Sequence, residues 1–152
     1  YLIDHNIRDK GEFQLTNAME QMKQKGARFK AGAVDTWMDC GNKNAMVDTN
    51  AKVLGFLQDR KDLVHPKAVV KDSVVIPPCF IAEGVTLRQA VVGPFVSIEG
   101  GTTITGSVVR NAIVRRQVNI TDAVVANSML GERTTVRGKA QDLNIGDDCT
   151  VE

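Results

Sequence analysis

Residues 81–130 read IAEGVTLRQAVVGPFVSIEGGTTITGSVVRNAIVRRQVNITDAVVANSML, and the spacing of their aliphatic side chains decides the fold. An aliphatic residue at position i is followed by a small or aliphatic residue at i+4, and the pattern restarts five or six residues later. The rule extends outward from this stretch to cover residues 64–151, with one irregular step after Val136. A repeat this regular predicts that more than half of the chain forms one repetitive structure.

Every third start of the pattern returns to the same register, so the starts fall into three columns. The first column is Val64, Ile81, Ile98, Val114 and Leu130, the second is Val70, Leu87, Ile104, Ile120 and Val136, and the third is Ile76, Val92, Val109 and Val125. Each unit is too short for a helix and is rich in Val, Ile and Thr, which favour strands. The columns predict a three-sided coil of short parallel strands, about five turns long, with aliphatic side chains inside. Gly, Asn and Asp residues fall near its corners, where tight turns need permissive backbones.

This pattern resembles the left-handed parallel β-helix of hexapeptide-repeat proteins, and the segment Val64-His65-Pro66-Lys67-Ala68-Val69 looks like the usual first rung of that family. The handedness is implied by the resemblance alone. A β-sandwich is the alternative, but it needs strict alternation and turn signals every eight to twelve residues. It would not explain three aligned aliphatic columns.

Composition narrows the classes of partner. The 152 residues carry a net charge of +1, which gives no reason to expect binding to nucleic acid or to a membrane. No apolar run is long enough for a membrane span, and no signal peptide is evident. Three widely spaced cysteines, Cys40, Cys79 and Cys149, are expected to be free thiols in a reducing cytoplasm. We interpret the basic residues of the later repeats as a solvated face, partly balanced by acidic neighbours, rather than as an anion-binding patch.

The first sixty residues follow a different period. A helix is expected from near Thr16, as its N-cap, to Gly26, and residues 28–34 and 37–40 are expected to be extended. A second helix is expected to be capped by Asn42 and to run to about Asp59. Its expected apolar stripe consists of Ala45, Met46, Val53, Leu54 and Leu57.

Two helices and one or two strands are too few to enclose a core of their own. We therefore expect residues 1–60 to be the C-terminal remnant of a larger α/β domain, and residues 64–152 to be a separate β-helix domain. The chain as a whole is expected to be a C-terminal fragment.

Two segments of this first part carry a resemblance to the sugar-1-phosphate nucleotidyltransferases. Gly11-Glu12-Phe13-Gln14-Leu15-Thr16-Asn17-Ala18 resembles the G-E-x-Q-L-T-D-A segment of that family, with Asn17 in place of the usual Asp. Val34-Asp35-Thr36-Trp37-Met38-Asp39-Cys40-Gly41-Asn42 is similar to its W-x-D-C-G-T/N segment. The family also places a helix, and in several branches a β-helix, directly after this motif.

The resemblance implies an activity and a set of site residues. In the family, a sugar 1-phosphate attacks a nucleoside triphosphate, which gives a nucleotide-sugar and pyrophosphate with the help of Mg²⁺. It implies that Asp39 is a metal ligand, that Gly41 lets the backbone turn beside the phosphates, and that Glu12 and Gln14 lie near the sugar. Asp39 could instead stabilise the start of the second helix. Glu12 and Gln14 could equally be residues of the helix entry.

Several parts of the family pattern are not found in these residues. They include the Gly-rich G-x-G-x-R loop, the phosphate-binding Lys and the first metal-binding Asp. The pair Gly100-Gly101 cannot be the Gly-rich loop, because it lies inside the repeats. We therefore expect no catalytic residue in this chain and no turnover by the chain alone. The expected partners of the parent enzyme are a nucleoside triphosphate and a sugar 1-phosphate, with the sugar and the base left open.

Two other functions remain as alternatives. A hexapeptide-repeat acyltransferase would use a His base, but only His5 and His65 are present, and neither lies in a deep coil. A purely structural module would assemble into a homo-oligomer through the coils. Val75, Val92, Val109, Val125 and their neighbours are candidate contact positions, with the inward or outward direction of each side chain left open.

Overall fold

The computed structural model describes residues 1–38, 40–60 and 62–138. The chain divides into two compact units, Tyr1–Trp37 and Met38–Glu152. Each unit is described separately below. The second unit contains the repeats and one helix, and it holds the hydrophobic core of the described chain.

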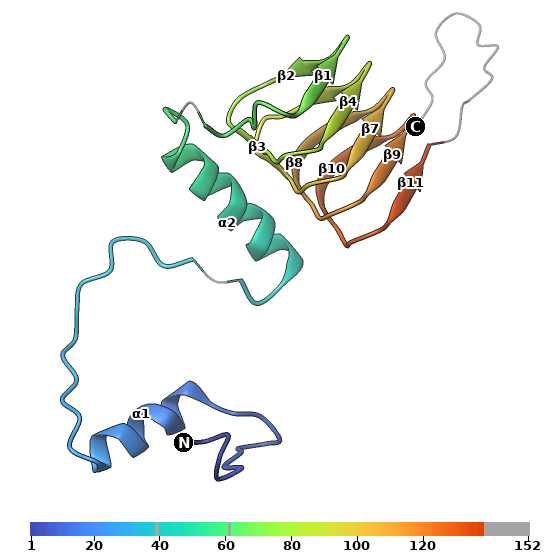
Figure 1. Ribbon diagram of the computed structural model, residues 1–152. Coiled ribbons are helices and arrows are strands. Elements are labelled where there is room, and N and C mark those ends of the chain that lie inside the picture. Colours follow the sequence, from blue (N-terminus) through green and yellow to red (C-terminus); the bar gives the residue numbers. More distant parts are fainter. Residues whose placement is uncertain (39, 61, 139–152) are drawn as a thin grey trace, which may run out of the picture. The chain divides into compact units, whose positions relative to one another are not determined.

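The repeats form a parallel β-helix (Figure 1). One sheet runs in the order β1 (Val69–Lys71), β4 (Thr86–Arg88), β7 (Thr103–Thr105), β9 (Asn119–Thr121) and β11 (Thr135–Arg137). The other sheet contains β2 (Val74–Val75), β5 (Val91–Val92), β8 (Val108–Val114), β10 (Val124–Leu130), β6 (Val96–Ile98) and β3 (Cys79–Ile81). The long strands β8 and β10 pass a corner, so that β8 pairs with β5 by its first half and with β6 by its second. All of these pairs are parallel, as predicted.

The registers confirm the first two predicted columns. Ile81 pairs with Ile98, Ile98 with Val114, and Val114 with Leu130, while Val64 bridges to Ile81. The second column likewise runs through hydrogen-bonded neighbours from Val70 to Val136. These five residues per column make about four turns of solenoid. The rest of the predicted fifth coil, with Ile145, Cys149 and Val151, lies outside the described residues.

The third column is wrong at its first member. Val75, not Ile76, pairs with Val92, and the column continues through Val109 to Val125. Val75 is half-buried, whereas Ile76 is 40% exposed. The error has a simple cause, because Val74, Val75 and Ile76 are three successive aliphatic residues and either register satisfies the spacing rule.

The core is a stack of aliphatic side chains inside the coils. Among the largest buried residues, Ile81, Leu87, Ile98, Ile104 and Ile120 have no exposed surface. Thr102 is equally buried, and its hydroxyl is satisfied because it donates to the carbonyl of Arg115 and accepts from the amide of Val118. Burial of each such aliphatic side chain contributes about 1.5–3 kcal/mol.

The corners repeat a left-handed backbone conformation from coil to coil. The three rows of positive φ are Asp72, Gln89, Gly106 and Asp122, then Gly84, Gly101, Gln117 and Arg133, then Phe95, Asn111 and Asn127. Several of the Gly, Asn and Asp residues predicted near corners are therefore confirmed, but Gln89, Gln117, Arg133 and Phe95 adopt the same conformation without that chemistry. Gly93, at φ 113°, is required by a close approach as well, because a Cβ there would overlap the carbonyl oxygen of Ile76.

Helix α2 (Lys43–Phe56) belongs to the same unit as the coils and lies against β6, β8 and β10. Asn42 is its N-cap, as predicted, and accepts a hydrogen bond from the amide of Ala45 at 3.0 Å. The helix ends at Phe56, three residues before the expected position. The predicted apolar stripe is confirmed at Leu54, which is buried, and at Ala45, Met46 and Leu57, which are partly buried. It is wrong at Val53, which is 36% exposed, and it lacked Val47, which is buried.

The first unit contains one helix, α1 (Leu15–Gln24). Its N-cap is Gln14, without a side-chain cap, so the expected capping role of Thr16 is wrong. Gly26 ends the helix as predicted, because the amides of Gly26 and Ala27 donate to the carbonyls of Lys23 and Met22 in a Schellman arrangement. The expected strand at 28–34 does not form, and the described residues of 37–40 form none either. A strand needs a paired neighbour for its backbone groups.

Val109 and Val69 test which side chains point inward, because they lie on strands of the coils with 0% and 48% exposure. Val109→Ala removes buried methyl groups and leaves a cavity, so it should lower the free energy of unfolding by about 2 kcal/mol. Val69→Ala on β1 is the matched control and should change it by less than about 0.5 kcal/mol. Urea unfolding followed by circular dichroism measures both. Equal losses would contradict the assigned direction of the valines.

Cys79 and Cys40 should differ sharply in reactivity. Cys40 is exposed, whereas Cys79 is 2% exposed and burial raises the pKa of its thiol. In the Cys149→Ser variant at neutral pH, iodoacetamide followed by peptide mass spectrometry should therefore label Cys40 promptly and Cys79 only after unfolding.

The raised pKa of Cys79 also makes the free energy of unfolding depend on pH. As the pH rises, the thiol ionises in the unfolded chain before it ionises in the folded chain. The contribution of the buried neutral thiol to the free energy of unfolding is therefore complete below the unfolded pKa of about 8.5 and is lost as the pH rises towards the folded value. The unfolding free energy of Cys79→Ala should depend less on pH in that range. Prompt labelling of Cys79 in the folded chain would contradict its burial.

Candidate functional site

Asp39, the predicted metal ligand, lies outside the described residues. The residues that follow it are described: Cys40 and Gly41 are exposed and lead into Asn42, which caps α2. The cap position of this helix is thus occupied by Asn42. The assignment of Asp39 as a metal ligand stays a prediction. The last residues of its motif, Cys40 to Asn42, belong to the same compact unit as the coils.

Glu12 and Gln14 are brought together in the first unit. Asp9 and Glu12 form an antiparallel bridge, and the side-chain amide of Gln14 donates to the carboxylate of Glu12 at 3.3 Å. Glu12 is exposed and Gln14 is half-buried at the entry to α1. The arrangement presents a carboxylate held by an amide, which is a suitable pair for binding sugar hydroxyls. It equally fits the alternative role of helix-entry residues.

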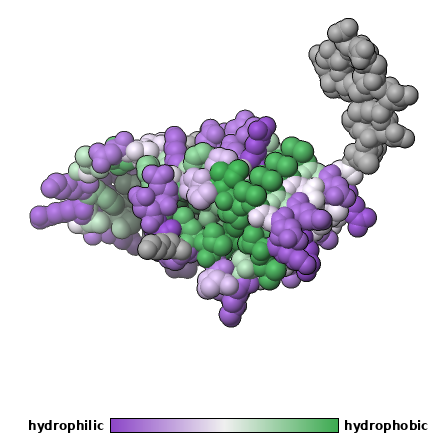
Figure 2. All heavy atoms as spheres, turned by 90° about the horizontal axis from the view of Figure 1, so that it is seen from above, coloured by the Kyte–Doolittle hydropathy of each residue, from purple (hydrophilic) through white to green (hydrophobic). Residues whose placement is uncertain are grey.

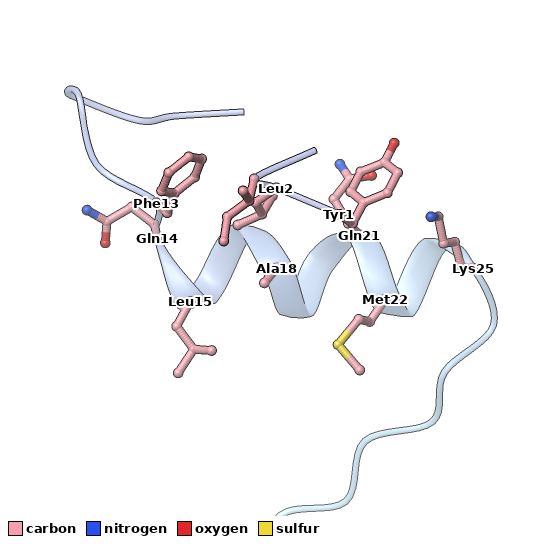
Figure 3. Close-up of a pocket in the computed structure, with 10 residues that line it drawn as sticks. Tyr1, Leu2, Phe13, Gln14, Leu15, Ala18, Gln21, Met22 and Lys25 are labelled. Carbon is pink, nitrogen blue, oxygen red and sulfur yellow. The ribbon is translucent and has the colours of Figure 1, made fainter. Parts of the chain in front are cut away.

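Gln14 also lines a groove of about 490 Å³ along one side of α1 (Figure 3). Most of its lining is apolar, and Ile3 and Leu15 are 75% and 76% exposed there. Lys25 is a cation at the far end of the groove, and its ammonium lies 3.6 Å from the centre of the Tyr1 ring. An apolar groove with its cation held over an aromatic ring is poorly suited to phosphate.

Magnesium requires little of the protein. Among the residues that the structure describes, no group of three or more His, Cys, Asp or Glu side chains could hold a metal ion. Mg²⁺ is usually held by only one or two protein carboxylates together with water and substrate phosphates. A single carboxylate at position 39, which lies outside the residues that the structure describes, would fit that chemistry.

A charged network covers one corner of the coils. Glu99 lies 3.2 Å from Arg115 and 3.6 Å from Arg116, and Glu132 lies 3.3 Å from Arg115 and 3.0 Å from Arg133. The hydrogen bond from Arg115 lowers the pKa of Glu132. These ion pairs support the interpretation as a solvated face balanced by acidic neighbours for Arg115, Arg116 and Arg133.

The two histidines have local roles. The His65 ring accepts a hydrogen bond from the amide of Lys67 in the first-rung turn, and His5 stacks on Tyr1 in the first unit with ring centres 4.2 Å apart. Neither contact indicates that the histidine acts as the general base of an acyltransferase. The helices of the described chain are also too short or too polar to cross a lipid bilayer.

The chain matches no protein-family model. It is similar to two curated proteins, both named glucose-1-phosphate thymidylyltransferase. The protein from Streptomyces antibioticus is 26% identical over 142 residues, and the one from Streptomyces griseus is 28% identical over 142 residues. Each comparison covers 84% of this chain but 40% of the relative, so the chain spans less than half the length of these proteins. Together with the parallel β-helix, these similarities confirm the resemblance to sugar-1-phosphate nucleotidyltransferases that the motifs around Glu12 and Asp39 indicate.

Proposed function

We propose that this chain is the C-terminal portion of a nucleotidyltransferase that joins a sugar 1-phosphate to a nucleoside triphosphate and releases pyrophosphate. The supporting observation is the extent of the similarity. It covers 84% of 152 residues, whereas the repeats from residue 64 onward account for only about three fifths of the chain. The similarity must therefore include a large part of the first sixty residues, where both motifs lie. A resemblance of coils to coils alone would not reach that far.

The relatives suggest which substrates to test first. Both are named for glucose 1-phosphate and thymidylyl transfer, so glucose 1-phosphate and thymidine triphosphate form the leading pair. The free thiols of Cys40 and Cys79 agree with a reaction in a reducing cytoplasm.

The proposed site roles follow from the motifs and from the described contacts. Asp39 would hold Mg²⁺, which, when bound, offsets negative charge on the phosphates. Gly41 leaves room for the backbone beside them. Glu12, held by the amide of Gln14, would accept hydrogen bonds from sugar hydroxyls. No residue of this chain is assigned as an acid, a base or a nucleophile, so turnover depends on the remainder of the enzyme.

A second role, assembly, is favoured by one face of the coils. Val74, Val91, Val108 and Val124 form an outward column on neighbouring rungs, and Val74 and Val124 are 56% and 76% exposed. Figure 2 shows hydrophobic side chains gathered in a patch bordered by hydrophilic ones. Among the candidate contact positions, Val92, Val109 and Val125 are wrong because they are buried inside the coils, and the outward residues are their neighbours in the sequence.

The spacing of the outward column favours a second copy of the chain as its partner. Strands of a sheet lie about 4.8 Å apart, so a surface that contacts every valine must repeat at that distance. Another copy of the same column has this period. Burial of the valines would remove apolar surface from water on each of four rungs.

The catalytic proposal is tested in the full-length enzyme by pyrophosphate release with a panel of sugar phosphates and triphosphates. Asp39→Asn should lower kcat by on the order of 10²–10³, because a charge that stabilises the transition state is lost. Asp48→Asn, which changes an exposed carboxylate on α2, is the control and should leave turnover unchanged. Circular dichroism should show the β-helix intact in both variants. Unaltered turnover in Asp39→Asn would remove this residue from the site.

The assembly proposal is tested by sedimentation velocity of the chain. The double variant Val108→Glu/Val124→Glu places charges on adjacent rungs of the apolar column and should sediment as a monomer, whereas the parent chain sediments as an oligomer. The control is Asn119→Glu/Thr135→Glu, which changes two exposed residues on adjacent rungs of the other sheet. A monomeric parent chain, or an oligomer that survives the valine substitutions, would exclude this face.

A further inference from the structure

Helix α2 is fastened to the coils by a polar residue in the middle of its buried face. Asn50 lies between the buried residues Val47 and Leu54 on that face. Its side-chain oxygen accepts a hydrogen bond from the Ser97 hydroxyl at 2.6 Å, and its amide donates to the carbonyl of Phe95 at 3.3 Å. Both hydrogen bonds are partly buried.

A second contact holds the start of the helix to a different coil. The ammonium of Lys43, the first residue of α2, donates to the backbone carbonyl of Asn127 at 3.0 Å. Ser97 is on β6 and Asn127 is on β10. The helix is therefore tied at two points along its length, to rungs that are not adjacent.

The Asn50 contact sets a register as well as adding stability. A purely apolar face could slide or rotate with little loss, but a partly buried amide must keep its partners because unpaired polar groups are costly. A displacement of one helical turn would take Asn50 away from both Ser97 and Phe95. The polar residue thus selects one position of α2 on the coils.

That position extends to the residues before the helix. Asn42, Gly41 and Cys40 precede α2 directly, and Met38 onward belongs to the same compact unit as the coils. Asn50 is eight residues from Asn42, which is about 12 Å along a rigid helix. Any shift of Asn50 on the coils therefore moves the Cys40–Asn42 turn.

We propose that Ser97 of the β-helix is a positioning residue for nucleotidyl transfer, because through Asn50 it sets the location of the Cys40–Asn42 turn. The inference rests on the proposed function, in which this turn adjoins the phosphates. The coils then serve the reaction directly, in addition to any role in assembly. Small errors of placement at a reacting centre are known to cost large factors in rate.

The test uses the full-length enzyme with glucose 1-phosphate, thymidine triphosphate and varied Mg²⁺. Ser97→Ala should lower kcat about tenfold and raise the Mg²⁺ concentration for half-maximal rate, with little change in the KM for the sugar phosphate. Ser97→Thr keeps the hydroxyl on a strand that accepts β-branched residues and should restore the rate. The matched control is Ser73→Ala, whose hydroxyl bonds the carbonyl of Lys71 and the amide of Ala90 without contacting α2.

Hydrogen exchange of this chain gives a readout that is independent of activity. Ser97→Ala should speed exchange in α2 and in the adjoining turn while the coil strands β4 and β7 stay protected, and Ser73→Ala should leave α2 as it is. Unchanged exchange in α2 would overturn the fastening. An active enzyme whose kcat is unaffected by Ser97→Ala, or equally reduced by Ser73→Ala, would overturn the positioning role. A parent enzyme that releases no pyrophosphate from any substrate would instead overturn the proposed function. The exchange result would still show whether Ser97 holds α2 on the coils through Asn50.

Discussion

The vertical stacking of aliphatic residues in three columns is the constraint on which the rest of the structure depends. Parallel hydrogen bonds tie each rung to the one before it, so the chain must turn at the same place in every coil. The strand registers therefore fix the backbone conformation of the corner residues, whatever their side chains. Gln117 and Arg133 adopt positive φ where Gly84 and Gly101 do so in earlier coils. A left-handed backbone costs a non-glycine residue about 1–2 kcal/mol, and burial of one inward isoleucine or leucine per rung offsets it.

The interior is fixed by the columns, whereas the outward residues differ between the three faces of the coil. The face of β1, β4, β7, β9 and β11 presents polar residues such as Thr103 and Asn119, while the face that includes β2 and β5 presents an aliphatic column. The third region is covered by α2. Because the coil repeats along its axis, an outward residue recurs at one strand spacing from rung to rung. Surfaces for assembly and for helix packing can therefore be made by substitution at outward positions, without altering the core.

The predictability of the molecule from its sequence follows the same division. Column two could be predicted because most of its inward positions, such as Leu87 and Ile104, have polar residues on both sides. Column one could be predicted from its regular spacing, although Phe80, Ile113 and Met129 stand next to inward residues. Column three failed at Val75 because that residue has aliphatic residues on both sides and the spacing rule accepts either register. The strand expected at 28–34 failed for another reason: β-propensity alone does not supply a partner strand. On the site, the motifs predicted the resemblance to nucleotidyltransferases. The contact between Asn50 and Ser97 was missed, although an amide between Val47 and Leu54 on one helix face was a signal that could have been weighed.

The position of α2 gives a physical reason for a coil stack to accompany a nucleotidyltransferase motif. A short helix with two fully buried apolar side chains gains limited stability from packing alone, and its orientation would be loosely defined. The coils offer a flat, repetitive surface that by itself would accept such a helix in more than one register. A single amide with two partners on β6 and the preceding corner removes that ambiguity. The rigidity of the stack is thereby passed to Cys40, Gly41 and Asn42, which precede the helix, and a β-helix becomes a means of positioning the end of the motif.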